Sequence, residues 1–290
     1  MGWLGDLWMR ARRPRVAPGE IPAALERVRT HLDAGEMEDG FALLQGVLAA
    51  GPQGDDLVEA HALAGELRAD AGAWREAHEE FAKALALAPE DGLILGADGE
   101  ALFNLWEFES AKASLARAVE LEPDDATSHR TLALALDRLG DPKGAGKHFR
   151  KAVKLDEVSF PLPVRVTRAE FDALARAAIG SLPDWVLQRL NQKISFVAQD
   201  YPSLALLGGR AEEADPQTLG LFWGEDLSRA PGSRDQADFV PNQILLFQRN
   251  LEQLVGTREA LEEEVYTTVF HEVGHYLGYD EEELDRIGLA

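Results

Sequence analysis

Apolar and small side chains recur along the first half of the chain at an interval of 34 residues. A period of this length is that of a helix-turn-helix unit, so the sequence predicts an array of helical hairpins. Three copies keep the same register across small, large and proline positions. The recurring positions are Trp74, Ala77, Phe81, Ala84, Leu87 and Pro89, then Phe108, Ala111, Leu115, Ala118, Leu121 and Pro123, and then Pro142, Ala145, Phe149, Ala152 and Leu155.

The residue types at these positions indicate how the hairpins pack. We expect Ala77, Ala111 and Ala145 where two helices cross closely, because a small side chain lets two backbones approach. Phe81 and Phe149 are expected to fill the space between neighbouring hairpins. Pro89 and Pro123 end the second helix of their units, and the first helices are predicted at residues 57–70, 93–105 and 127–139.

A more degenerate copy precedes these three units. It runs from Gly35 to Leu48 and matches once a short insertion at residues 51–54 is allowed for, so we interpret it as a capping repeat. These segments resemble tetratricopeptide repeats, and we assign the array to residues 21–159, after an N-terminal segment at residues 1–20. The resemblance implies a concave surface that binds a protein or peptide. The predicted first helices carry few basic residues, which makes acidic C-terminal peptides poor candidates. Alternatively, the array only spaces or dimerises the second domain.

The repeat period stops after Asp156, and a new domain is predicted over residues 160–290. The prolines in Phe160-Pro161-Leu162-Pro163 end any continuing helix. Thr167 and Glu170 form a predicted capping box for a helix that ends near Gly180, and a second helix is expected to end at Leu190. Three strands are predicted at Ile194–Ala198, Thr218–Trp223 and Gln243–Phe247. We therefore expect an all-α repeat array followed by a small α/β domain with a short mixed sheet, α+β overall.

Composition and charge exclude several classes of protein. With 46% hydrophobic residues the chain has the content of a globular protein, and its formal charge of -22 is unlike that of a nucleic-acid-binding protein. The one basic run, Arg10 to Arg15, follows a short apolar stretch that cannot span a bilayer, and this order is wrong for a secretory signal. We expect a cytoplasmic protein. Because the chain has no cysteine, any metal must be held by His, Asp or Glu.

The candidate chemistry lies in His271-Glu272-Val273-Gly274-His275, near the end of a helix predicted from Thr257 to Gly278. Residues four apart in a helix lie one turn apart on the same face, so both imidazoles can bind one ion. Glu272 is rotated by about 100° from that line and lies beside the ion rather than on it. There it can take a proton from water as a general base. The acidic residues after Gly278 supply carboxylates for a third ligand.

The region from Thr167 to Leu289 resembles the minimal zincin-like metallopeptidase family of bacteria. The resemblance rests on Asp200-Tyr201-Pro202, Leu219 to Gly224, Pro241 to Ile244 and the His271 to Gly278 segment, in this order along the chain. It implies a zinc ion held by His271 and His275, with Glu272 as general base. The third ligand in this family follows the glycine by three residues and is usually aspartate. Here Glu281 is the choice by spacing, and Asp280 is the alternative by residue type.

Two functions follow from these patterns. The first is a zinc metallopeptidase that hydrolyses peptide bonds and uses its repeats to recruit a protein substrate or regulator. The alternative is a non-catalytic interaction scaffold with a degenerate or structural metal site. If the strand at Gln243–Phe247 is an exposed edge of the sheet, an extended peptide substrate could pair with it beside the metal.

Overall fold

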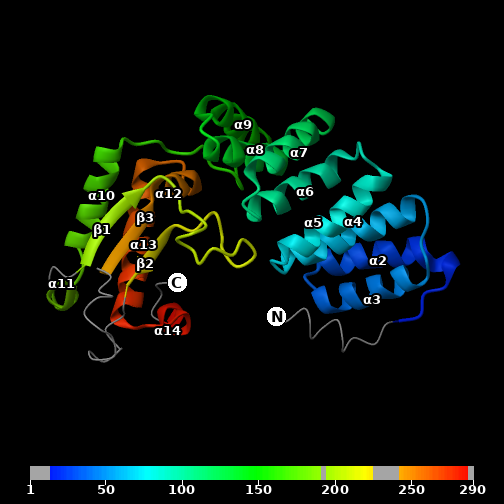
Figure 1. Cartoon of the computed structure of the whole chain (residues 1–290), viewed down its shortest axis with the longest axis horizontal. Coiled ribbons are helices and arrows are strands. Elements are labelled where there is room, and N and C mark those ends of the chain that lie inside the picture. The colour runs from blue at the N-terminus through cyan, green and yellow to red at the C-terminus, as the bar shows by residue number, and fades with distance from the viewer. Residues whose placement is uncertain (1–13, 191–193, 225–241, 287–290) are drawn as a thin grey trace. The chain divides into compact units, whose positions relative to one another are not determined.

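The computed structural model describes residues 14–190, 194–224 and 242–286, and these residues divide into two compact units (Figure 1). The first, called the repeat unit here, extends to Glu157 and also includes Arg210–Ala214. The second, called the sheet unit, contains Val158–Gly209 and the chain from Asp215 onward. Across the described residues, no helix is both long enough and apolar enough to cross a membrane.

The repeat unit is helical throughout its regular structure, as predicted. The strongest packing is between successive helices, which form the pairs α2 with α3, α4 with α5, α6 with α7 and α8 with α9. The first helices of the three repeats begin within two residues of the predicted positions. In chain order the elements are η1 (Pro18–Glu20), α2 (Ile21–Asp33), α3 (Met37–Ala49), α4 (Asp55–Asp70), α5 (Trp74–Leu87), α6 (Gly92–Asn104), α7 (Phe108–Leu121), α8 (Ala126–Arg138) and α9 (Pro142–Leu155).

Small residues let the paired helices approach closely. Ala77, Ala111 and Ala145 are buried, as the repeat pattern requires. Glycine is needed on the facing helix at two further positions separated by 34 residues. A Cβ atom at Gly65 would lie 2.4 Å from the ring of Phe81, and one at Gly99 would lie 2.4 Å from Leu115 Cγ. The repeat spacing thus sets close contacts that leave no room for a methyl group.

The last repeat holds a pair of histidines between α8 and α9, a buried His129 and a half-buried His148. His129 Nδ1 and His148 Nδ1 are 2.9 Å apart with the rings stacked, and His129 Nε2 lies 3.1 Å from the carbonyl oxygen of Pro123. Burial lowers the pKa of both imidazoles, because it disfavours the charged form. Lys151 further lowers the pKa of His129, and the charge of His129 further lowers that of His148.

The sheet unit contains a mixed three-stranded sheet and five helices within its described residues. The helices are α10 (Arg168–Gly180), α11 (Asp184–Leu190), α12 (Gln248–Leu254), α13 (Arg258–Leu277) and α14 (Glu281–Arg286), and the strands are β1 (Ile194–Gln199), β2 (Gly220–Trp223) and β3 (Asn242–Phe247). Thr167 and Glu170 form the predicted capping box at the start of α10. The buried carboxylate of Glu252 forms salt bridges with both Arg165 and Arg249.

The strand order is β1-β3-β2, so β3 is the central strand. It pairs with β1 in parallel and with β2 antiparallel. The condition for substrate pairing with Gln243–Phe247, an exposed edge, is therefore not met, because the hydrogen-bonding groups of this strand are used on both sides. The buried pattern of β3 agrees with this position, since Ile244 to Phe247 are all buried. Among the described strands, the edges of the sheet are β1 and β2.

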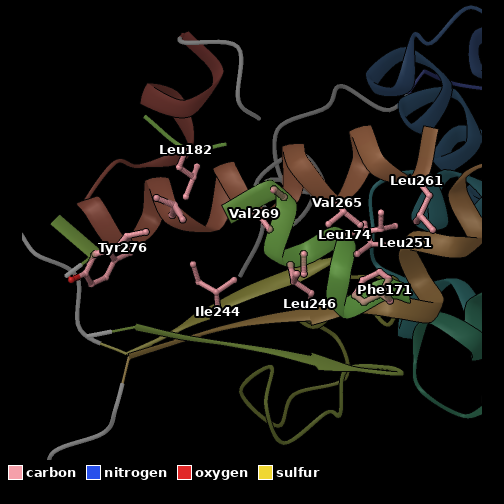
Figure 2. Close-up of a cluster of buried hydrophobic side chains, with 14 of the residues drawn as sticks. Phe171, Leu174, Leu182, Ile244, Leu246, Leu251, Leu261, Val265, Val269 and Tyr276 are labelled. Carbon is pink, nitrogen blue, oxygen red and sulfur yellow. The ribbon is translucent and has the colours of Figure 1, made fainter. Parts of the chain in front are cut away.

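The core of the sheet unit lies between the sheet and the helices α10 and α13 (Figure 2). Ile244 and Leu246 of β3 point toward Val265 and Val269 of α13, and Phe171 of α10 packs into the same cluster. α13 thus has one apolar face fixed against the sheet along most of its length. This packing determines which residues of α13 remain on the polar side.

Replacing Gly99 by alanine tests the close helix packing of the repeats. The added methyl group would collide with Leu115, so we expect the free energy of unfolding to fall by about 1–3 kcal/mol. Gly146→Ala is a matched control on α9, where the new methyl group meets only Arg150 Nη1 at 3.4 Å. There alanine should raise stability by up to about 1 kcal/mol through its higher helix propensity. Urea denaturation followed by circular dichroism measures both, and equal effects would contradict the packing argument.

The pair formed by His129 and His148 predicts a loss of stability on acidification. Because the folded state lowers the pKa of His129 and His148 below the ordinary value of 6.5, the unfolded chain binds protons first as the pH falls through that value. Protonation of the two histidines therefore lowers the free energy of unfolding as the pH falls below 6.5. This loss levels off once the pH is below their pKa in the folded state. We expect the fall in stability between about pH 7.5 and about pH 5.5 to be smaller in His148→Gln than in the wild type. An identical pH dependence in thermal melts would contradict this role.

Candidate metal centre

The C-terminal end of α13 carries the two histidines of the motif and then reverses the chain. Gly278 ends the helix with φ of 95°, a left-handed conformation that favours glycine. The amide of Gly278 donates to His275 O at 3.0 Å, and the amide of Tyr279 donates to Gly274 O at 3.1 Å. These bonds satisfy the last carbonyl groups of α13 and direct the following residues back toward the histidines.

His271 and His275 lie one turn apart, and their rings converge. Their Nε2 atoms are 3.0 Å apart, close to the roughly 3.3 Å that separates two ligands around a tetrahedral zinc ion. His275 Nδ1 lies 3.2 Å from the carbonyl oxygen of Tyr279. When Nδ1 carries the proton and donates to that carbonyl, the Nε2 lone pair is directed at the common point. The local backbone thus orients one of the two imidazoles for metal binding.

Glu281, in the first turn of α14, joins the two histidines. Its Oε1 lies 3.2 Å from His275 Nε2, and its Oε2 lies 3.8 Å from His271 Nε2. One ligand atom from each of the three side chains lies within 4.8 Å of the others. The carboxylate itself is largely exposed. Two nitrogens and one carboxylate oxygen form a donor set that suits zinc and leaves positions open for water or substrate.

Asp280 has a different environment. Its Oδ1 accepts the amide of Glu283 at 2.9 Å, and its own amide donates to Glu283 Oε2 at 3.1 Å. This reciprocal pair is a capping box for α14. The carboxylate of Asp280 is therefore occupied in starting the helix that presents Glu281.

Gly274, inside the motif, has a packing role. A Cβ atom at this position would lie 2.4 Å from Leu284 Cδ2 of α14. Leu284 is buried, so α14 packs directly on the backbone of α13. Close packing at Gly274 holds the element that carries Glu281 against the element that carries the histidines.

Glu272 is buried on the side of α13 that faces β2. Its side chain is 7% exposed, and its Oε2 accepts the backbone amide of Phe222 at 2.6 Å. Burial raises the pKa of Glu272, while His271, His275 and the Phe222 amide oppose that rise. A carboxyl group whose pKa is raised in this way is a better proton acceptor than an exposed one. The Phe222 amide is a contact that reasoning from side-chain motifs missed, because a backbone group has no residue signature.

A second His and carboxylate group lies in the repeat unit, formed by His31, Glu36 and Asp39. His31 Nδ1 is 2.6 Å from Glu36 Oε2, and both carboxylates are exposed. An ion pair of this kind at the junction of α2 and α3 stabilises the turn without a metal. The arrangement in the sheet unit differs because both of its histidines face the same point.

Comparison with known proteins finds one family match within the helical array and one in the C-terminal part of the chain. The family model of the zincin-like metallopeptidases matches residues 191–289, and a tetratricopeptide repeat model matches residues 128–158. The chain is also 34% identical over 86 residues to an Hsp70-Hsp90 organizing protein of Triticum aestivum. That match covers 30% of this chain and 15% of the length of the wheat protein.

Solved structures similar to this one align with about half of the chain. MamA from Desulfovibrio magneticus RS-1 is 20% identical, with a TM-score of 0.42 and coverage of 47% of this chain and 76% of that one. PilF of Pseudomonas aeruginosa is 23% identical, with a TM-score of 0.43 and coverage of 48% and 62%. By the two family models, the chain contains an N-terminal tetratricopeptide repeat region followed, at residues 191–289, by a domain of the zincin-like metallopeptidase family.

Proposed function

We propose that the sheet unit is a zinc-dependent peptidase, with His271, His275 and Glu281 as metal ligands and Glu272 as general base. The observation that carries this proposal is the convergence of the two Nε2 atoms and the Glu281 carboxylate within 4.8 Å. The buried carboxylate beside them supports an enzyme over a structural metal site, because a structural ion needs no neighbouring base. Asp280 is not proposed as a ligand, because its carboxylate caps α14.

The proposed reaction is hydrolysis of a peptide bond by water. Zinc bound by the three ligands would supply Lewis acidity toward the scissile carbonyl and would acidify a water molecule. Glu272 takes one proton from the attacking water as the water oxygen bonds to the carbonyl carbon. It then delivers that proton to the nitrogen of the leaving amine as the C–N bond breaks. The carboxylate is thereby regenerated for the next cycle.

The edge of the sheet gives an extended substrate a place beside this site. Since β3 is central, the strand with an open side next to Glu272 is β2. A peptide in extended conformation can add to such an edge through main-chain hydrogen bonds. We propose that substrate pairs with outward-facing main-chain groups of β2 other than the Phe222 amide, which donates to Glu272. We also propose that the tetratricopeptide repeats recruit a protein that is either the substrate or a regulator.

The choice of third ligand is tested by a matched pair of substitutions. We expect Glu281→Ala to weaken zinc binding at least about tenfold, because it removes a donor atom. Asp280→Ala should leave zinc affinity close to that of the wild type while lowering thermal stability, since it removes a cap worth about 1 kcal/mol. Competition with a chromophoric chelator measures the affinities. The reverse pattern, with zinc lost only in Asp280→Ala, would exclude Glu281 as the ligand.

The role of Glu272 is tested by digestion of a broad peptide library. Glu272→Gln keeps the size of the side chain but cannot accept the proton, so cleavage should fall at least about 100-fold with zinc still bound. Glu263→Gln is the control, because Glu263 is an exposed acid on the same helix. We expect that variant to cleave at the wild-type rate. A zinc-loaded wild-type protein that cleaves nothing in the library would count against the peptidase and favour the non-catalytic scaffold.

A further inference from the structure

We propose that β2 positions the general base, with the Phe222 amide holding one oxygen of Glu272 and Gly220 leaving room for the other. This inference rests on the proposed peptidase function. It assigns a role to two residues outside the metal ligands, and neither would touch the reacting atoms. They are positioning residues, because they act only through Glu272.

The direction of the Phe222 amide follows from the pairing of β2 with β3. The amide of Phe247 donates to Leu219 O at 2.8 Å, so these two residues form a hydrogen-bonded pair of the antiparallel ladder. Such pairs alternate along the ladder with pairs whose amides point away from the partner strand. Phe222 lies three residues beyond Leu219 and opposes Ile244, so it belongs to the pairs whose amides point away from the partner strand. Its amide therefore points out of the sheet edge, where it meets Glu272 Oε2 at 2.6 Å.

Gly220 lies where the side chain of Glu272 passes the strand. A Cβ atom on Gly220 would lie 2.7 Å from Thr268 Cγ2, 2.9 Å from Glu272 Cγ and 3.0 Å from Glu272 Oε1. Any side chain at this position would push the carboxylate away from its place. The absence of a side chain thus lets α13 and β2 approach until the amide two residues further on reaches the carboxylate.

These two contacts give the two carboxylate oxygens of Glu272 different roles. Oε2 is engaged by the amide, and Oε1 has no hydrogen-bond partner among the described residues. A carboxylate fixed at one oxygen keeps the other in a defined direction, so Oε1 is the atom that accepts the proton of the attacking water. Fixing a catalytic group before substrate arrives saves the entropy of orienting it during the reaction.

The amide is tested by comparing Phe222→Pro with Phe222→Ala. Both variants lose the ring that packs against Tyr276, but only proline removes the donor. Proline is tolerated on an edge strand where the amide faces outward. We expect kcat of Phe222→Pro to lie about 10-fold to 100-fold below that of Phe222→Ala, with KM and zinc content alike. Equal kcat values in the two zinc-loaded variants would overturn the proposal.

The glycine is tested by Gly220→Ala, with Gly256→Ala as its matched control. At Gly256 the nearest neighbour of the new methyl group is Pro161 Cβ at 3.4 Å, an ordinary contact. We expect Gly220→Ala to lose about 10-fold to 100-fold in kcat while binding zinc normally, and Gly256→Ala to retain activity. Zinc content and thermal melting exclude misfolding as the cause. Full activity in a folded Gly220→Ala protein would contradict the role of this residue.

A measurement that needs no substrate separates this inference from the proposed function. In ¹⁵N-labelled protein, the amide proton of Phe222 should be protected from exchange in the wild type and should lose that protection in Glu272→Ala. If the Phe222 amide is protected only when Glu272 is present, but the protein cleaves no peptide, the proposed peptidase function is wrong and the contact between Phe222 and Glu272 stands. Rapid exchange of this amide in the wild type would defeat the contact whatever the activity.

Discussion

The packing of α13 against the sheet is the constraint on which the rest of the candidate site depends. Val265, Val269 and Val273 are buried on one side of the helix, which fixes its rotation about its own axis. With the rotation fixed, His271 and His275 must leave from one face and Glu272 from a neighbouring one. The 3.0 Å between the two Nε2 atoms follows from their spacing of one turn on a single helix. Core packing instead turns Glu272 toward β2, where its Oε2 meets the Phe222 amide at 2.6 Å.

The chain reversal at the end of α13 brings a third side chain, Glu281, next to the two histidines of the helix. The left-handed residue Gly278 turns the chain, Asp280 starts α14, and Leu284 packs onto Gly274. Each step is short-range and uses an interaction worth about 1 kcal/mol or slightly more. Together they bring the largely exposed carboxylate of Glu281 to 3.2 Å from His275 Nε2 and 3.8 Å from His271 Nε2. The proposed third donor is therefore supplied by local chain reversal rather than by a distant element.

Sequence patterns predicted the repeats and the helices. They did not predict the order of the strands or the contacts made by backbone groups. The 34-residue period located helices α4, α6 and α8 because each repeat makes the same contacts with its neighbours. Whether Gln243–Phe247 lies at an edge was left open by the sequence, because the order of strands depends on how distant segments pair and not on their own residues; the strand is central. Spacing left Glu281 and Asp280 as alternatives, because side-chain directions after a left-handed turn cannot be read from residue types. The contact between Phe222 and Glu272 was missed for a related reason, since any residue but proline carries an amide.

Two carboxylates of the same residue type have opposite environments at this site, and the difference favours distinct roles. Glu272 is 7% exposed, accepts a backbone amide and has a raised pKa. Glu281 has a side chain that is 71% exposed and is held by the short helix α14. A proton acceptor benefits from burial, because a desolvated carboxylate binds a proton more tightly and cannot exchange its partners with bulk water. A metal ligand at the rim of the site benefits from exposure, because little hydration is lost before the ion arrives. The environments alone therefore favour the proposed role of base for Glu272 and of ligand for Glu281, without reference to the motif that contains Glu272.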